Sequence, residues 1–414
     1  MSILPGQAAA RAQLAAVRPQ AYARSRNHLD GAVTGLSPYL THGLLDLPQV
    51  LAGVLAHEDL PVQHKLVFEL GWRAYFRHVW AHRSDGIFTS LHDGLLPETA
   101  YSQALPADIR EARTGLPVID QAVRTLYASG TLHNHARMWL ASYVVHLRKV
   151  HWRVGADWLY AHLLDGDLAS NHLSWQWVAG TGSSKPYLFN AENVAHYAPP
   201  DWHCSGSAID TSYEQLADWA HDARWAMRPF GPAAIGITEP ALHTGPPPTL
   251  TLTPPERTNL QGRTVWLVHP WDLAPPPPDL PADTVVLGIY LADVHRAWPW
   301  SVARWAFVDA GMAERTPLRC HVEADQLQAL LIGAQRVLCR AEPHLPPWLG
   351  QLAQLIEPAP LFAPQPRRCD SFSQWWTRAI RGRGRAAELL EDHRARSCGD
   401  FDYAPPRLTQ NEEL

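Results

Sequence analysis

The chain has 414 residues, 46% of them hydrophobic and 18% charged, with a formal net charge of −5 when histidine is neutral. This length favours two domains, because a single hydrophobic core stops growing beyond about 250–300 residues. The composition excludes a disordered chain, and the negative charge argues against non-specific coating of nucleic acid, although a local basic groove is compatible with it.

The first half of the chain, from about Gln7 to Met227, has the periodicity of helices. Apolar residues recur at spacings of three and four, as at Leu116, Ile119 and Val123. Pro117 stands where a helix can begin without losing a needed N–H. Further helices are expected over residues 131–150 and 155–164. We therefore predict an all-helical domain over residues 1–228.

The composition changes after this half. Fourteen of the 36 prolines fall between Pro229 and Pro281. We interpret residues 229–262 as a Pro-rich linker and the second group of prolines as a loop inside the next domain. The last residues, 399–414, form a polar tail.

Residues 263–398 alternate between strand and helix patterns. Buried strands are expected at 264–268 and 284–291, and shorter ones at 318–322 and 336–339. The helical periods are those of residues 301–312, 324–333 and 347–356. This alternation predicts an α/β domain with a mostly parallel sheet.

The run from Asp165 to Gly182 is the most informative part of the chain. It places two carboxylates, a carboxamide and two tryptophans within about four helical turns, which suits an aromatic, redox-active ligand. Upstream, Asn134, Arg137 and Met138 fall at i, i+3 and i+4, so all three can face one pocket.

Two earlier motifs add polar groups. The segment Thr34–Leu40 places hydroxyls at a helix start, where free N–H groups favour a phosphate, and Ser37 as an ordinary N-cap is the alternative. Glu69, Trp72 and Arg73 occupy adjoining positions of one helix face. Taken alone, that motif also fits a core tryptophan beside a surface acid.

Together these runs resemble the FAD-binding helical domain of the photolyase/cryptochrome family, from Tyr22 to about Tyr197. The resemblance implies FAD as cofactor, and the wide spacing of the cysteines predicts no metal site. Its implied FAD contacts are Tyr22, Thr34, Gly35, Leu36, Ser37, Arg73, Asn134, Arg137, Asp165, Asp167 and Asn171. Its implied substrate contacts are Glu69, Trp72, Met138 and Trp177, and its implied catalytic residues are Glu69, Asn134, Asn171, Trp175 and Trp152.

The resemblance also implies roles within these sets. Arg137 would pair with Asp165 beside the flavin, and Asn171 would face its N5 atom. The alternative for Asp165 and Asp167 is that both cap a helix N-terminus. Burial in a cleft would raise the pKa of Glu69 and let it donate to a base carbonyl.

A relay of aromatic residues is implied for photoreduction of the flavin. Trp175 and Trp152 match its first two members, while the third is open among Tyr101, Trp139 and Trp158. Core packing is the alternative for any single tryptophan.

The cyclobutane-dimer enzymes of this family carry Asn and Met at the positions of Asn134 and Met138, whereas the (6-4) branch carries His at both. We therefore expect light-driven repair of cyclobutane pyrimidine dimers, with damaged DNA as partner. The rival is a flavin photosensor or partner-binding protein without repair activity, and a third reading is a helical protein that binds no flavin.

Three features depart from the family. Thr131 stands where many relatives have a cleft tryptophan, and residues 183–190 differ from the usual longer segment. The helical half also comes first, whereas relatives generally begin with an α/β antenna domain. We therefore expect a circular permutation, with residues 263–398 as an antenna-like domain that carries a folate, a deazaflavin or no chromophore. A generic α/β module is the alternative.

The remaining expectations concern location and cysteine chemistry. The first residues lack a secretory signal, and no apolar run approaches the about 20 residues that span a bilayer. We expect a cytoplasmic monomer with no membrane partner. The cysteines are widely spaced and include no Cys-x-x-Cys pair, so reduced buried thiols are expected at Cys204, Cys320, Cys339, Cys369 and Cys398.

Overall fold

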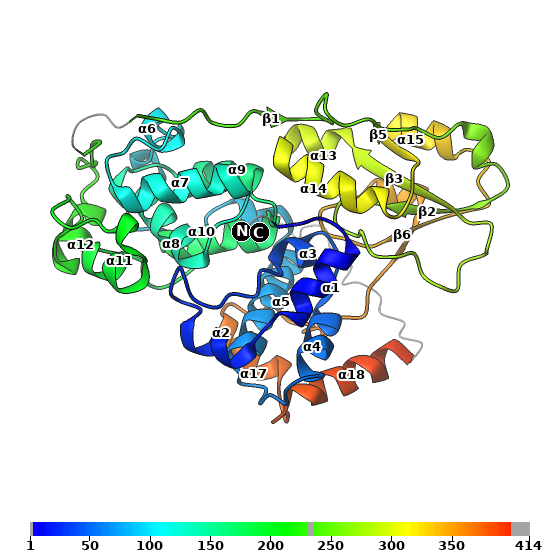
Figure 1. Cartoon of the computed structure of the whole chain (residues 1–414), viewed down its shortest axis with the longest axis horizontal. Coiled ribbons are helices and arrows are strands. Elements are labelled where there is room, and N and C mark those ends of the chain that lie inside the picture. The colour runs from blue at the N-terminus through cyan, green and yellow to red at the C-terminus, as the bar shows by residue number, and fades with distance from the viewer. Residues whose placement is uncertain (1–2, 231–234, 399–414) are drawn as a thin grey trace, which may run out of the picture.

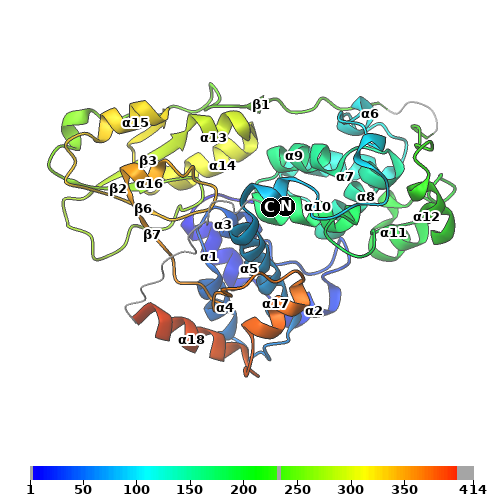
Figure 2. The same ribbon diagram turned by 180° about the vertical axis from the view of Figure 1, so that it is seen from behind.

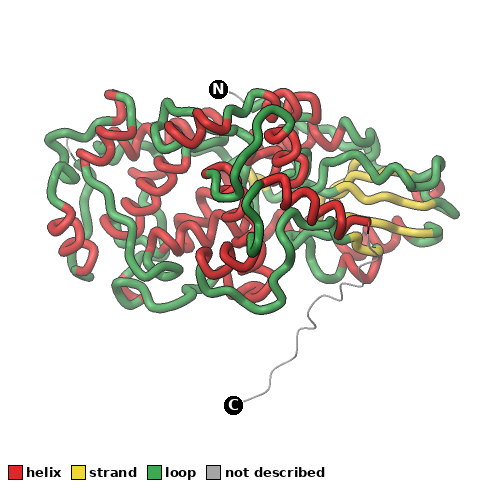
Figure 3. Tube along the Cα trace, turned by 90° about the horizontal axis from the view of Figure 1, so that it is seen from below, coloured by secondary structure: helices red, strands yellow, loops and turns green. Residues whose placement is uncertain are grey.

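A computed structural model of the chain describes residues 3–230 and 235–398. The predicted tail at 399–414 lies outside the described residues. Figure 1 shows three groups of elements: α6 to α12 on one side, the sheet with its helices on the other, and α1 to α5 below, together with α17 and α18. Seen from below, the strands gather at one end of the molecule (Figure 3).

The first half is helical, as its periodicity predicts. Its α-helices are α1 (Gln7–Ala15), α2 (Pro19–Ser25), α3 (Ser37–Thr41), α4 (Leu47–Leu55), α5 (Lys65–Arg83), α6 (Ala107–Arg110), α7 (Pro117–Ser129), α8 (Asn134–Ser142), α9 (Trp152–His162), α10 (Leu168–Ala179), α11 (Ala191–Tyr197) and α12 (Tyr213–His221). Short turns of other helix types are η1 (Ser84–Phe88), η2 (Glu98–Ala100), η3 (Tyr143–Leu147) and η4 (Pro200–Trp202).

The helix α7 illustrates how the sequence sets the local structure. Pro117 is its first residue, its buried face includes Ile119 and Val123, and it ends at Gly130 with φ 66°. Glycine is favoured there because the left-handed conformation strains residues that carry a Cβ.

The single helix expected over residues 131–150 is wrong in its details. α8 begins only at Asn134, because the His133 ring accepts from the N–H of His135 and caps the helix. After Ser142 the backbone continues as the π-helix η3, all of whose residues are buried. Apolar periodicity does not distinguish such a π segment from α-helix.

The second half contains a five-stranded parallel sheet in the order β5-β3-β2-β6-β7. The helices and strands of this part of the chain, in order, are η5 (Arg257–Asn259), β2 (Thr264–Val268), β3 (Val285–Leu291), α13 (Ala292–Ala297), β4 (Trp300–Ser301), α14 (Val302–Ala313), β5 (Arg319–Val322), α15 (Ala324–Leu331), β6 (Arg336–Arg340), α16 (Leu349–Leu352) and β7 (Gln354–Ile356). The predicted parallel α/β sheet is confirmed. The strand order reverses between β2 and β6, so the loops that follow these two strands meet at one edge of the sheet.

The expected helical period over residues 347–356 is wrong at its end. The helix α16 stops at Leu352, and residues 354–356 form the edge strand β7, which pairs with β6 (Figure 2). Apolar runs as short as this one do not separate strand from helix by period alone.

The predicted linker is extended, and part of it pairs with a strand of the second half. Its strand β1 (Leu242–His243) pairs antiparallel with β4, and Figure 1 shows this segment crossing from the side of α6 to the sheet. The linker residues 231–234 lie outside the described residues.

Two helices that follow the sheet in sequence pack against helices of the first half of the chain. α17 (Phe372–Ala379) and α18 (Ala386–Cys398) lie against α5 and α4, as Figures 1 and 2 both show. The N–H of Ala386 donates to the carbonyl of Leu60 over 2.9 Å. One buried hydrophobic cluster joins α1, α4 and α5 to the sheet and to α17 and α18, and a second spans α6 to α12. The domain boundaries at 228, 262 and 398 stay predictions.

Candidate functional site

The turn between α9 and α10 carries the two carboxylates of the sequence motif. Asp165 accepts two hydrogen bonds from Nη2 of Arg137 on α8, at 2.9 and 2.8 Å. The Asp165 side chain is 7% exposed and that of Arg137 is 26% exposed. A charge-assisted pair at this level of burial holds α8 and the turn in a fixed relation.

Asp167 has different partners. Its side chain accepts from the N–H of Ser170 and so caps α10, and it pairs with Arg77 at 2.6 Å and Arg73 at 3.8 Å. Burial would raise the pKa of Asp167, but the two guanidinium groups outweigh burial and hold its pKa well below the usual range. The helix-capping alternative therefore describes Asp167, whereas Asp165 pairs with Arg137.

Asn171 and Trp175 lie one turn apart on α10. The amide Nδ2 of Asn171 donates to the carbonyl of Ala156 over 2.8 Å. Trp175 is buried and packs so closely on α9 that a Cβ at Gly155 would lie 2.3 Å from its ring. Asn171 and Trp175 are thus fixed against α9, which also carries Trp152.

The relay candidates are divided between two places. Trp152 is buried and donates to Oγ of Ser90 over 3.0 Å. The His151 ring lies 5.6 Å from Trp152 and 6.3 Å from Tyr101, centroid to centroid. Tyr101 is therefore connected to Trp152 through one ring.

The other two relay candidates have separate surroundings. Trp139 donates to Asn193, and Trp158 donates to Glu239, each over 3.0 Å. Both indoles are buried. Their hydrogen bonds explain their positions as core residues.

On α5, Glu69 forms an ion pair of 3.1 Å with Arg26. Burial raises the pKa of Glu69, while Arg26 and Lys65 oppose that rise. The Arg26 guanidinium also lies 5.9 Å from the centroid of the Tyr22 ring. Tyr22 and Glu69 are thus brought together by one arginine that the sequence motifs did not include.

Trp72 and Arg73 have different surroundings from Glu69. Nη2 of Arg73 donates to Oγ1 of Thr41 over 3.1 Å. The Trp72 ring is stacked on Phe372 of α17, with centroids 4.0 Å apart. One face of the expected substrate-contacting indole is therefore covered by the chain itself.

The hydroxyl segment begins α3 without a side-chain cap. Leu36 holds the N-cap position and Ser37, which is exposed, is the first helical residue, so the reading of Ser37 as an N-cap is wrong. Gly35 adopts φ 63° just before it. The carbonyl of Thr34 accepts from Gln13, and its hydroxyl accepts from the N–H of Leu36.

The remaining substrate candidates are the more exposed ones. Asn134 is exposed, and its amide lies 3.5 Å from the sulfur of Met138. Trp177 is 39% exposed and lies beside Tyr187. The hydroxyl of Thr131, the departure from the family pattern, lies 3.0 Å from that of Ser129.

Sequence reasoning missed several charged residues at this site. Arg77 stands one helical turn after Arg73 on α5, which was a usable signal. It bridges Asp167 to Glu342, and Glu342 accepts from Nδ1 of His344 over 2.6 Å. Burial would raise the pKa of Glu342, but Arg77 and His344 lower it to about 2. Glu342 and His344 follow β6, so no local pattern connects them with the helical motifs.

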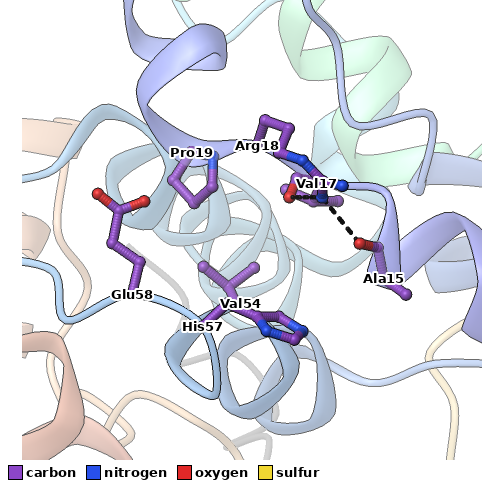
Figure 4. Close-up of a pocket in the computed structure, with 7 residues that line it drawn as sticks. All are labelled: Ala15, Val17, Arg18, Pro19, Val54, His57 and Glu58. Atoms are coloured by element: carbon purple, nitrogen blue, oxygen red, sulfur yellow. Dashed lines mark hydrogen bonds between the residues drawn. The ribbon is translucent and has the colours of Figure 1, made fainter.

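One pocket lies away from these residues. It encloses about 320 Å³ near the end of α1 and the end of α4 (Figure 4), and its lining residues are Ala15, Val17, Arg18, Pro19, Val54, His57 and Glu58. The Arg18 guanidinium there donates to the carbonyls of Ala15 and Val17. This pocket includes none of the candidate site residues.

The structure describes the side chains of four of the five cysteines. The thiols of Cys204, Cys320, Cys339 and Cys369 are free and buried; the side chain of Cys398 lies outside the described part. Within residues 3–230 and 235–398, no group of three or more His, Cys, Asp or Glu side chains is arranged to hold a metal ion. Over the same ranges, no helix has the length and apolar character needed to cross a membrane.

Comparison with known proteins identifies a domain that includes much of this helical region. Residues 66–204 match the FAD-binding domain of DNA photolyase. A deoxyribodipyrimidine photo-lyase of Synechococcus sp. is 34% identical over 212 residues, which cover 46% of this chain and 42% of that protein. A chloroplastic/mitochondrial cryptochrome DASH of Oryza sativa subsp. japonica is 33% identical over 199 residues, covering 43% of this chain and 34% of that protein.

A solved cryptochrome structure from Synechocystis sp. is also similar, at 28% identity and a TM-score of 0.41, covering 47% of this chain and 44% of that chain. The chain thus spans less than half the length of these relatives. The matched domain precedes the α/β region, in agreement with a permuted order. Residues 66–204 are thus a helical FAD-binding domain of the photolyase/cryptochrome family.

Proposed function

We propose that the chain binds FAD between α3, α5, α8 and α10 and uses it for light-driven repair of cyclobutane pyrimidine dimers in DNA. The observation that carries this proposal is the pair of Arg137 with Asp165, in which one guanidinium nitrogen donates to both carboxylate oxygens, six residues before Asn171. The match of residues 66–204 to the FAD-binding domain of DNA photolyase supports FAD as the ligand.

Polar groups of Ser37 and Asn171 that have no hydrogen-bond partner described above fit such a cofactor. A diphosphate needs donors, and Ser37 offers an exposed hydroxyl at the start of a helix that no side chain caps. An isoalloxazine ring needs amide and charged partners at its edge. Nδ2 of Asn171 is engaged with Ala156, so the oxygen of that amide is the end left to accept from a ring N–H.

The protein would supply position and electrostatics around the cofactor. When bound, reduced FAD excited by light supplies the electron that opens the cyclobutane ring and takes it back afterwards. Arg137 and Asp165 would hold the ring edge, and Trp177 would stack on the flipped dimer, because the dimer is out of reach inside the DNA helix. Glu69 would contact a base carbonyl of the dimer. To make that contact, Glu69 would give up its ion pair with Arg26.

A second candidate is a flavin photosensor without repair activity. It is favoured by the stacking of Phe372 on Trp72, which covers one face of a residue assigned to the dimer. The net charge of −5 also gives little general attraction to DNA. The relatives include proteins named as photo-lyases and as cryptochromes, so both candidates fit the similarity.

Illumination of the reduced, FAD-loaded protein with a thymine-dimer oligonucleotide separates the two candidates. Repair predicts loss of dimers in the light and none in the dark, and a slower rate in Glu69→Gln. Glu214→Gln, on α12, is the matched control and should keep the wild-type rate. A yellow protein that photoreduces its flavin but leaves dimers intact would contradict repair and favour the sensor.

A further inference from the structure

The turn from Leu164 to Asp167 connects α9 with α10 and carries both carboxylates of the proposed flavin site. Its backbone carbonyls are held by side chains from outside the turn. The contacts are Leu164 O with Nε2 of His42 at 2.8 Å, Asp165 O with Oγ1 of Thr41 at 3.3 Å, and Gly166 O with Nη2 of Arg304 at 2.5 Å. The N–H groups of Leu164 and Gly166 donate to the carbonyls of Gly130 and Leu163, so these three side-chain partners satisfy the carbonyls of the turn and add to its backbone bonds.

Of the three partners, Arg304 comes from the α/β half. It lies on α14 and is completely buried, 138 positions along the chain from Gly166. Its Nη1 donates to the carbonyl of Tyr160 over 3.2 Å, near the end of α9, where helical carbonyls lack partners. One guanidinium thus connects the end of α9 with the peptide that separates Asp165 from Asp167.

The position of the guanidinium is itself fixed. Its central carbon lies 4.1 Å from the centroid of Trp300 and 4.7 Å from that of Tyr160. Gly166 permits the approach, because a Cβ there would lie 2.4 Å from Nη1 of Arg304. Planar stacking and a forked donor set are properties of arginine that lysine lacks.

A second contact from the α/β half reaches the same turn. Nε2 of His344 accepts from the N–H of Leu168, and Glu342 shares Arg77 with Asp167. The loop after β6 therefore supports Asp167 while α14 supports Gly166. Gly166 and Asp167 are therefore both in contact with the region that the family comparison does not cover.

A buried cation is a weak source of stability, because its desolvation offsets much of its attraction to neighbouring charges. Packing alone would be served by an apolar side chain of similar size. The geometry of Arg304 instead matches two specific carbonyls, which is the pattern of a group that fixes a backbone conformation.

We propose that Arg304 is a positioning residue for the flavin site: it fixes the Asp165–Asp167 turn so that Asp165 meets Arg137. The expected effect of Arg304 on FAD affinity rests on the proposed function. The expected effect of Arg304 on the turn does not. The α/β half then sets the geometry of the cofactor site.

The test uses the full chain and three variants. Arg304→Met keeps the length and removes the charge and donors, and Arg304→Lys keeps the charge without the fork. Arg319→Met is the matched control, because Arg319 pairs with Asp309 within the α/β half. Hydrogen exchange of residues 164–168 is measured without FAD, and FAD affinity is measured by titration.

We expect Arg304→Met to speed exchange at residues 164–168 and to weaken FAD binding at least about tenfold, equivalent to about 1.4 kcal/mol. Arg304→Lys should lie between it and the wild type, and it carries the test if Arg304→Met does not fold. Arg319→Met should match the wild type in both measurements.

Exchange and affinity in Arg304→Met equal to those in Arg319→Met would overturn the inference. Failure of this inference can be distinguished from failure of the proposed function. If the wild-type chain binds no FAD while exchange still rises in Arg304→Met, the role of Arg304 in the turn stands and the flavin proposal fails.

Discussion

The ring of Phe372 lies flat on the ring of Trp72, with centroids 4.0 Å apart and planes inclined by 7°. Phe372 begins α17, which follows the sheet in sequence but packs on α5. Trp376 of the same helix lies over Gly71, where an added Cβ would be 2.4 Å from its ring. The chain's own C-terminal region therefore occupies one face of the residue that the family resemblance assigns to the substrate.

Replacing Phe372 with Ala should expose Trp72. We expect tighter binding of the reduced protein to dimer-containing DNA, together with a loss of about 3–5 kcal/mol in the free energy of unfolding, because Phe372 is buried. Phe362→Ala is the control for that loss, since Phe362 is buried against Trp375 and Trp376. Equal DNA affinity in the two variants would mean that the stack does not restrict access to Trp72.

The contact between Gly166 and Arg304 can also be tested through Gly166, because Gly166→Ala should displace the Arg304 guanidinium. The added methyl group would lie 2.4 Å from Nη1 of Arg304 and 2.7 Å from the carbonyl of Tyr160, so one of them must move. We expect a loss of about 1–3 kcal/mol in stability, as for other overpacked sites, and weaker FAD binding. Thermal unfolding and FAD titration measure the two effects.

The control for Gly166→Ala is Gly384→Ala. An added Cβ at Gly384 meets no atom within 4 Å, so this substitution should leave both quantities close to the wild type. An equal effect of the two substitutions would show that the Gly166 contact has no special role.

Trp175→Phe should slow photoreduction of the flavin more than it slows dimer splitting by pre-reduced protein. Trp175 is buried on α10 against Gly155 of α9, the helix that begins at Trp152, and the family resemblance implies that these two indoles are successive members of the relay. Flavin absorbance under illumination measures the first rate. The exposed Trp177 gives the contrasting variant, since Trp177→Phe should affect splitting instead. Equal losses of both rates in Trp175→Phe would reject its assignment to the relay.

The stability of the chain should fall as the pH drops from 7 to 5. His146 is completely buried, and burial lowers its pKa from 6.5 to about 4. The unfolded chain therefore takes up a proton below pH 6.5 that the folded chain does not, so the folded state loses about 2 kcal/mol per such histidine by pH 5. Chemical unfolding at several pH values measures this slope.

The variant His146→Gln can keep the hydrogen bond to the carbonyl of Val178 without titrating. Its stability should depend less steeply on pH than that of the wild type. His57→Gln, at an exposed position, is the control. Identical slopes in all three proteins would show that His146 does not contribute.

The sequence was informative where local patterns decide the structure. The strand over residues 264–268 has the predicted bounds, because a continuous apolar run with polar flanks fits a buried parallel strand. The pair of Arg137 with Asp165 was implied by the family resemblance. Those residues lie 28 positions apart on neighbouring elements.

Contacts between distant parts of the chain were not predictable in this way. Arg304 and Gly166 are separated by 138 positions, and neither stands in a pattern that marks the other. The packing of α17 on α5 depends on tertiary contacts of the same kind. Sequence periodicity shows that a helix has an apolar face, but it does not show which element covers that face.

Binding of FAD to the wild type and to Arg137→Met is the most direct measurement of the central claim. We expect one FAD per chain in the wild type and affinity at least about tenfold lower in Arg137→Met, because Asp165 loses the guanidinium nitrogen that donates to both of its oxygens. Arg319→Met should bind FAD as the wild type does. A wild-type chain that binds no FAD, or an Arg137→Met variant with unchanged affinity, would contradict the account.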